Sequence, residues 1–341
     1  MNSHKIRLGF AAIIALAGTT ALAQSSATLF GTIDIGIAHV KSATSSVTGL
    51  SNSGANVSRF GFRGIEDLGG GLGAGYWLEA GVWPDQGTGP FGAPVSFNRR
   101  STVNLFGKWG EVRLGRDDSA TFLNALLFDP FLTNGIGGTN AFMMNGAPTQ
   151  ISNAVSYFAP PDLHGFYAQL QHAFGEQVNS SPTAAGEFLG ARFGYRAGGL
   201  HLAGAVGKLQ GVTQAGDVEM RNAGASYDFG SVQPMALWAT ETRNGIQVRA
   251  LQLGVKVPVG VGEIRASVAR YDTSHSDADW RKFAVGYGHN LSKRTQLYAT
   301  VAGIDNSAQS KKVVGSFGLP TLGNSPGGRS NGYEAGVRHF F

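Results

Sequence analysis

Residues 58–72 read SRFGFRGIEDLGGGL, and they carry the clearest signal for the fold class. Arg59, Gly61 and Arg63 alternate with Phe60 and Phe62, so an extended chain presents guanidinium groups on one face and aromatic rings on the other. The acidic and glycine-rich run at residues 66–71 then predicts a tight turn. We interpret this stretch as an amphipathic strand that ends in a hairpin turn.

The same period of two recurs along most of the chain, for example in residues 166–174, 282–291 and 333–341. In the last of these, Tyr333 and Val337 oppose Glu334 and Arg338. A soluble β-sandwich would alternate in the same way, so the spacing of the breaks has to decide between the two architectures.

The breaks between these segments are of two kinds, in regular order. Seven short turns are expected at residues 66–71, 108–110, 160–162, 197–199, 229–231, 258–260 and 291–293. Eight more variable loops are expected at residues 41–54, 84–97, 117–150, 176–186, 210–216, 243–245, 273–278 and 306–330. Fifteen connections join sixteen strands, and both chain ends then lie on the short-turn side, as in outer-membrane barrels.

Strand length agrees with a barrel that spans a membrane. An apolar band about 25 Å tall, crossed at a tilt of about 40°, needs about ten residues per strand. The sequence therefore predicts an all-β fold, a transmembrane antiparallel β-barrel of about 16 strands. Its last strand, which ends at Phe341, must pair with the strand that begins near Thr28, because closure abolishes both sheet edges.

The first 23 residues have the features of a cleaved export signal. A basic start that includes Lys5 and Arg7 precedes an apolar run of about ten residues, which is shorter than the roughly 20 needed to span a bilayer. Small residues precede Gln24, so we expect a signal peptide at residues 1–23 and a barrel domain at residues 24–341. No other run of the chain approaches the length of a membrane-spanning helix.

Composition excludes several classes of function. The chain has no cysteine, which excludes thiol catalysis and thiolate metal sites, and its eight histidines lack metal-binding spacing. The chain has 27 basic and 22 acidic residues, and loss of Lys5 and Arg7 leaves 25 basic residues and a formal charge of +3. That charge and the absence of a basic run argue against nucleic-acid binding. We expect no catalytic residues, no metal and no cofactor.

Residues 117–150 form the most unusual loop. They are too many for a hairpin and are rich in Phe, Leu, Ile and Met, and loops of this length usually have a function. We expect the loop to fold inside the barrel and pack against the wall, where Gly135, Gly137 and Gly138 let the backbone turn back. Packing on a neighbouring subunit is the alternative.

Taken together, these residues resemble the general porins of Gram-negative bacteria, particularly the sixteen-stranded trimeric type of betaproteobacteria. The resemblance runs from Leu29 to Phe341, and residues 58–72 are its most specific part. It implies a homotrimer in the cell outer membrane, exported through the periplasm and in contact with outer-membrane lipids. It also implies that the barrel assembly machinery recognises the C-terminal Phe341.

The resemblance further implies a water-filled pore that an inward-folded third loop narrows, with acidic groups on the loop facing basic side chains of the wall. Such a transverse field filters ions by charge and polar solutes by dipole. A third basic position of the family falls on Ser156, and a single plausible acidic tip, Asp129, lies on the loop, with Asp117 and Asp118 at its base. The candidate constriction residues are Arg59, Arg63, Arg99, Arg100, Arg116 and Asp129.

The expected function is passive diffusion of ions and small hydrophilic solutes through a channel with a weak anion preference. A substrate-specific outer-membrane channel is the alternative, favoured by the apolar third loop. An outer-membrane enzyme would need a catalytic constellation on adjacent strands, and none is evident. The motif at Gly323–Gly327 matches a hydrolase elbow, but Pro326 makes it a loop rather than a strand-to-helix turn.

Overall fold

The computed structural model describes residues 26–178 and 184–341, and strands dominate them. The strands are β1 (Ser26–Lys41), β2 (Ser46–Asn52), β3 (Arg59–Gly69), β4 (Leu72–Gly81), β5 (Arg100–Gly107), β6 (Gly110–Asp118), β7 (Gln150–Phe158), β8 (Phe166–Ala173), β9 (Phe188–Ala197), β10 (Leu200–Leu209), β11 (Val218–Tyr227), β12 (Gln233–Arg243), β13 (Ile246–Val259), β14 (Gly262–Thr273), β15 (Trp280–Asn290), β16 (Thr295–Asn306) and β17 (Ser330–Phe340). The helical elements of this part are α1 (Ala120–Leu127) and two 3-10 helices, η1 (Pro90–Gly92) and η2 (Gln214–Gly216). The predicted signal peptide at residues 1–23 lies outside the described residues.

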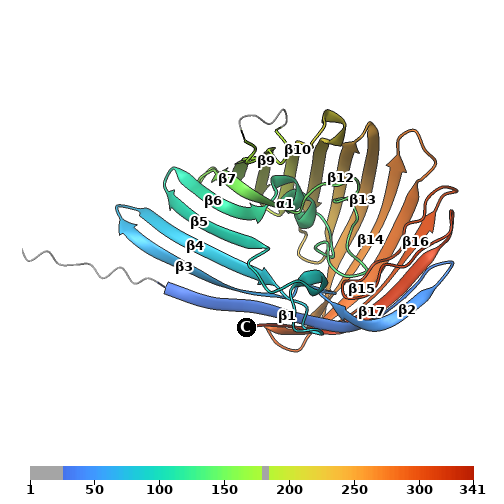
Figure 1. The fold of residues 1–341 in the computed structure, drawn as a ribbon. Helices are drawn as coiled ribbons and strands as arrows, with labels where there is room; N and C mark the ends of the chain where they lie inside the picture. Colours follow the sequence, from blue (N-terminus) through green and yellow to red (C-terminus); the bar gives the residue numbers. More distant parts are fainter. Residues whose placement is uncertain (1–25, 179–183) are drawn as a thin grey trace, which may run out of the picture.

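The strands close into a barrel of sixteen wall positions, as predicted. From β3 to β17 each strand pairs antiparallel with the next, and β17 pairs with β1 from Thr32↔Phe340 to Lys41↔Asn331. The other edge of β1 pairs with β3 along its first half and with β2 along its second half. Strands β2 and β3 therefore share one wall position, and Figure 1 shows both lying along β1.

One detail differs from the sequence expectation. Residues 46–52 fall within the predicted loop 41–54, but they form β2, because the chain turns back at residues 42–45 and pairs with β1 before it leaves the wall at residues 53–58.

The connections alternate between turns and more variable loops, as predicted, although one of the variable set, at residues 244–245, is only two residues long. All seven predicted short turns lie between consecutive strands, from the β3–β4 turn to the β15–β16 turn. In the first of them Gly69, Gly70 and Gly71 have φ of +84°, +62° and +81°, a backbone that residues with a Cβ rarely adopt. The glycine run is thus required by the turn itself.

Burial follows the predicted alternation. In β8, Gln169 is 2% exposed and Leu170 is 57% exposed, and the same contrast separates Lys282 from Phe283 in β15. We call the face that carries Gln169 and Lys282 the inner face of the wall and the face that carries Leu170 and Phe283 the outer face. Exposed large apolar residues recur on the outer face in strand after strand, as a lipid-facing surface requires.

The third loop, residues 119–149, packs against the inner face. Helix α1 begins after Ser119, whose Oγ accepts a hydrogen bond from the Phe122 N–H at 3.1 Å. The helix then packs against β9, β10 and β11. In Figure 1, α1 lies inside the ring of strands.

Glycines on the inner face make room for the rest of this loop. A Cβ at Gly224 would lie 2.0 Å from the Phe128 ring, and one at Gly254 would lie 2.3 Å from Pro130. Phe128 is fully buried, and the apolar residues that looked out of place in an exposed loop form the main hydrophobic core with the wall. No helix in residues 26–178 and 184–341 is long and apolar enough to cross a membrane.

Candidate functional site

Glu79 on β4 joins two of the predicted arginines. Its strand alternates, so Trp77 and Glu79 lie on the inner face. Arg99 Nε donates to Glu79 Oε1 at 2.7 Å, and Arg59 Nε lies 3.6 Å from the same oxygen. Trp77 Nε1 donates to the other oxygen at 3.1 Å. The structure thus brings Arg59 and Arg99 together around one carboxylate.

A second carboxylate, Asp117 on β6, holds two further arginines. Arg100 Nε lies 3.6 Å from Asp117 Oδ1, and its guanidinium carbon lies 4.5 Å from the centre of the Trp77 ring. Arg113 forms a close ion pair with Asp117 and a second one, at 2.9 Å, with Glu111. The alternation of β5 turns Arg100 inward, and Arg99 reaches the same face from just before the strand.

Arg63 completes this surface by stacking rather than by ion pairing. Its guanidinium carbon lies 5.0 Å from the ring of Trp77 and 5.3 Å from the ring of Phe30, within the range of cation–π attraction. We call the set of five guanidinium groups on the inner face of β3 to β6 the arginine wall. Its members are Arg59, Arg63, Arg99, Arg100 and Arg113.

Arg116 lies apart from the arginine wall. It pairs in register with Ser101, on the parity of the outer face, next to an irregularity in β6 between Gly115 and Asp117. Arg116 Nε donates to the Asn98 carbonyl oxygen at 2.5 Å, and Nη1 donates to Ser152 Oγ at 2.6 Å. Because Arg113 and Arg116 are three residues apart, one of them has to face away from the lumen, and the structure turns Arg116 away.

Asp129 is enclosed rather than displayed at a loop tip. It is fully buried, and it accepts hydrogen bonds from the N–H groups of Phe131, Thr133 and Thr139 at 3.2, 2.7 and 2.8 Å. Gln252 Nε2 from β13 donates to it at 3.3 Å. Burial raises the pKa of the Asp129 carboxyl, and the backbone N–H groups oppose that rise. The side chain expected at an exposed tip instead organises the turn of the loop.

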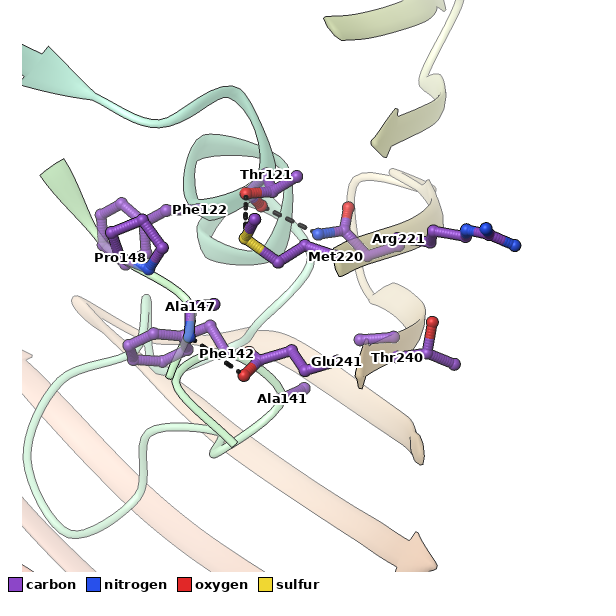
Figure 2. Close-up of a pocket in the computed structure, with 12 residues that line it drawn as sticks. Thr121, Phe122, Ala141, Phe142, Ala147, Pro148, Met220, Arg221, Thr240 and Glu241 are labelled. Carbon is purple, nitrogen blue, oxygen red and sulfur yellow. Dashed lines mark hydrogen bonds between the residues drawn. The ribbon is translucent and has the colours of Figure 1, made fainter. Parts of the chain in front are cut away.

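Two other carboxylates of the wall fasten the third loop. Glu241 on β12 accepts from the N–H groups of Asn145 and Ala147 at 2.6 and 3.3 Å, and the second of these bonds is visible in Figure 2. Glu334 on β17 accepts from the Ile136 N–H at 3.1 Å. The loop is therefore bonded to wall strands other than β3 to β6.

A third buried carboxylate fastens the inward segment between β2 and β3. Asp34 on β1 accepts from the N–H groups of Gly54, Ala55 and Asn56 at 3.2, 2.9 and 2.6 Å, and from the Tyr298 hydroxyl at 2.7 Å. Backbone N–H groups thus neutralise Asp34 locally, as they do for Glu241 and Glu334.

Exposure to water differs between the acidic and the basic groups. The carboxylate residues described above are buried: Asp34, Asp129, Glu334, Glu241, Asp117 and Glu79. The side chains of Asp117 and Glu79 are 7 and 10% exposed. The side chains of Arg59, Arg99, Arg100 and Arg113 keep 28, 19, 19 and 14% exposure. Glu111 is the exception, with 24% exposed, and it is paired with Arg113. Water in the lumen therefore meets mainly guanidinium groups here.

Comparison with known proteins agrees with this architecture. A family model described as Gram-negative porin matches residues 9–309. The chain belongs to this family. Outer membrane porin protein 32 of Delftia acidovorans is 37% identical over 351 residues, covering 97% of this porin and 98% of the relative. An outer membrane porin of Bordetella pertussis is 27% identical and covers 85% and 91%.

A solved structure is similar as well. The anion-selective porin from Comamonas acidovorans superimposes with a TM-score of 0.86 at 35% identity, covering 93% of this porin and all of that chain. The family assignment and the barrel make this protein an outer-membrane porin of a Gram-negative bacterium, a channel for ions and small solutes rather than an enzyme.

The third basic position of the family is occupied by Ser156 in this porin, and an arginine on the neighbouring strand lies opposite it. Ser156 on β7 is buried and pairs directly with Arg113 in the register of β6 and β7. Sequence reasoning missed Arg113 and Glu79 as members of the site. The signal for Glu79 was present, because it has the parity opposite to Tyr76 and Leu78 in an otherwise apolar strand. No cluster of three or more His, Cys, Asp or Glu side chains in the described parts of the porin could hold a metal ion.

Proposed function

We propose that this porin is an anion-preferring diffusion channel, and that its narrowest part lies between the arginine wall and the third loop. The observation that carries the proposal is the contrast in exposure on the inner face. An anion in the lumen can contact guanidinium groups directly, whereas a cation finds most carboxylates covered by arginines or by backbone N–H groups. In a narrow pore with low-dielectric walls such an arrangement favours anions.

The position of the third loop supports a constriction. The loop is bonded to β12, β13 and β17, and the arginine wall lies on β3 to β6, so the water path runs between the two. The anion selectivity named for the similar porin from Comamonas acidovorans supports the sign of the preference. In this proposal Arg113 supplies the charge that is missing at Ser156, and Asp129 acts through the loop.

Reversal potentials in a salt gradient test the proposal. The double variant Arg59→Ser with Arg99→Ser should shift the reversal potential of the purified channel in a planar bilayer towards cation preference. Arg116→Ser is the matched control, because it removes an arginine outside the arginine wall. An unchanged potential in the double variant, or an equal shift in the control, would remove the arginine wall from the filter.

Further assignments belong to the same proposal. We propose that residues 1–23 are removed as a signal peptide, that residues 24–341 form the barrel domain, and that residues 117–150 are the constriction loop. We also propose a homotrimer, contact with outer-membrane lipids, recognition of Phe341 by the assembly machinery, and no enzymatic activity. Mass spectrometry of the outer-membrane protein tests the cleavage site, and native electrophoresis tests the trimer.

A second candidate function, a channel specific for an apolar solute, is favoured by one observation. A hollow of about 810 Å³ lies between the loops at residues 82–99, 119–149 and 307–329, and Phe91, Met143 and Phe317 expose apolar side chains to it. A Cβ built on Gly81 would lie 3.0 Å from Pro90 and 3.5 Å from Arg99. Since Pro90 precedes Phe91, this hollow adjoins the arginine wall. Block of the chloride current by benzoate, weakened in a Phe91→Ala variant, would support this candidate, and equal block by acetate would reject it.

A further inference from the structure

Three arginines project from the outer face of neighbouring strands at the long-loop end of the barrel. Arg249 lies near the start of β13, Arg270 near the end of β14, and Arg281 is the second residue of β15. All three are exposed, whereas the residues next to them in sequence on the inner face are buried. We call these three residues the outer arginine cluster.

The outward direction of this parity is visible on another strand. In Figure 2 the Met220 side chain of β11 points towards the third loop, and the guanidinium of Arg221 points away from it. The three residues of the outer arginine cluster have the same outward parity as Arg221. They therefore point away from the lumen, outside the barrel, and do not line the pore.

Strand register brings the cluster close together. Arg270 and Arg281 are direct partners across β14 and β15, where the Cβ atoms of opposed residues are about 5 Å apart. Arg249 pairs with Asp272, so it lies diagonally next to Arg270 on the adjacent strand. Like charges that face each other directly destabilise a sheet unless another group neutralises them.

The protein supplies only part of that neutralisation. Asp272 forms an ion pair with Arg270 at 2.7 Å, and Asp305, which is opposite Arg281 in register, is bonded to Arg329 at 3.0 Å. Within the described residues, Arg249 and Arg281 form no ion pair. Two exposed guanidinium groups of the cluster are therefore left for a ligand, and guanidinium binds phosphate oxygens in a bidentate way.

Apolar residues adjoin the cluster on the side of the short turns. The next outward positions along the three strands are Leu251, Val268 and Phe283, and each is more than half exposed. The long-loop side of an outer-membrane barrel is its outer side, so the cluster lies where the apolar band meets the outer surface of the membrane. A lipid fits this surface, because its phosphate can contact the arginines and its acyl chains can contact the apolar residues nearer the membrane interior.

We propose that the outer arginine cluster binds the phosphate of an outer-leaflet lipid whose acyl chains lie on Leu251, Val268 and Phe283. A soluble anion would not use the apolar residues, whereas basic side chains at a membrane surface attract anionic lipid head groups. The site is separate from the pore, so it stands independently of the anion preference proposed above.

Lipid retention by the purified full-length porin tests this site. The test variant carries Arg249→Gln, Arg270→Gln and Arg281→Gln. The control carries Lys208→Gln and Arg221→Gln, which removes charge from two exposed residues of neighbouring strands that are already ion-paired to acidic side chains and lie away from the cluster; its charge-matched partner is the double variant Arg249→Gln with Arg281→Gln. All three are reconstituted in phosphatidylcholine vesicles that contain a trace of bisphosphorylated lipid A, and the lipid A that stays bound after extraction into mild detergent is measured.

The expected result is retention of lipid A by the unmodified porin and by the control. The test variant should bind it roughly a hundredfold more weakly, since each basic residue at an anionic membrane surface contributes a factor of about five. Unchanged conductance shows that the variant is folded, and the single variant Arg281→Gln replaces it if the triple variant does not assemble.

Three results would overturn the assignment. The first is equal retention by the test variant. The second is equal retention of lipid A from which both phosphates have been removed, which would leave only apolar contact. The third is complete displacement of the lipid by millimolar inorganic phosphate, which would assign the cluster to a soluble anion.

Discussion

Replacing Glu79 with glutamine should strengthen the anion preference of the channel without changing the shape of the pore. Gln retains an oxygen that can accept the hydrogen bond of Trp77 Nε1, so the side chain can stay in place. The lost negative charge lies 2.7 Å from Arg99 Nε and 3.6 Å from Arg59 Nε. Both guanidinium groups then act on lumen ions without a counter-charge.

The size of the effect follows from Coulomb's law. An anion that touches Arg99 lies about 6 Å from the Glu79 carboxylate, and at that distance one charge in a water-like dielectric changes its energy by about 0.7 kcal/mol. Salt at about 0.1 M has a Debye length of about 10 Å, so screening leaves most of this energy. The energy that remains, about 0.4 kcal/mol, acts with opposite sign on a cation, so the anion-to-cation permeability ratio should rise by about fourfold.

The assay is the reversal potential of single channels in a potassium chloride gradient. Glu263→Gln is the matched control, because Glu263 is bonded to a single arginine, Arg265, at the same 2.7 Å and lies outside the arginine wall. We expect a smaller shift from the control. A Glu79→Gln channel that keeps the original potential, or moves towards cation preference, would refute the view that covered carboxylates and exposed arginines set the selectivity.

Three further predictions concern the third loop. Deletion of residues 122–145 should raise single-channel conductance, and an unaltered conductance would mean that the loop does not narrow the lumen. Lys282→Met removes the ammonium that donates to the Gly138 carbonyl oxygen and, at 3.2 Å, to Asn140 Oδ1, so open-channel current noise should increase; noise equal to that of the unmodified channel would contradict this anchoring role. Gly224→Ala places a Cβ 2.0 Å from the Phe128 ring, which should destabilise the fold by about 1–3 kcal/mol in thermal unfolding. Gly204→Ala, whose Cβ meets nothing closer than 3.7 Å, should unfold at the original temperature, and equal behaviour of the two variants would argue against tight packing of the loop.

Alternation was enough to predict the wall of the barrel. A period of two assigns each residue to one of two faces, so Arg59 and Arg63 could be placed on the inner face and the order of turns could give sixteen strands. The strand β2 escaped prediction because residues 46–52 alternate weakly and pair only with one half of β1. Strand β2 forms because β1 is long enough to pair with it beyond β3, and the sequence of residues 46–52 alone does not show the length of that partner.

The candidate site was less predictable because it depends on contacts between distant residues. Sequence could show that Asp129 is the acidic residue near the middle of the loop, but not that three backbone N–H groups of the loop would enclose it. Likewise, whether Arg113 or Arg116 faces the lumen depends on the phase of β6, which is irregular between Gly115 and Asp117. In both cases the direction of a side chain depends on the local backbone conformation, which the alternation of residues in the sequence does not determine.

In the proposed channel, the fastening of the third loop has a consequence for how the opening between this loop and the arginine wall fluctuates. Its bonds to Glu241, Gln252, Lys282 and Glu334 tie it to strands from β12 to β17, so this side of the opening moves only as the wall moves. On the opposite side, Arg63 is exposed and is held by stacking rather than by an ion pair, and exposed side chains change rotamer in picoseconds to nanoseconds. The instantaneous width of the opening is then governed by side-chain motion that averages out during the passage of one ion. An opening with one rigid side and one mobile side should carry a steady current, and its permeability should fall gradually rather than abruptly as the size of the solute increases.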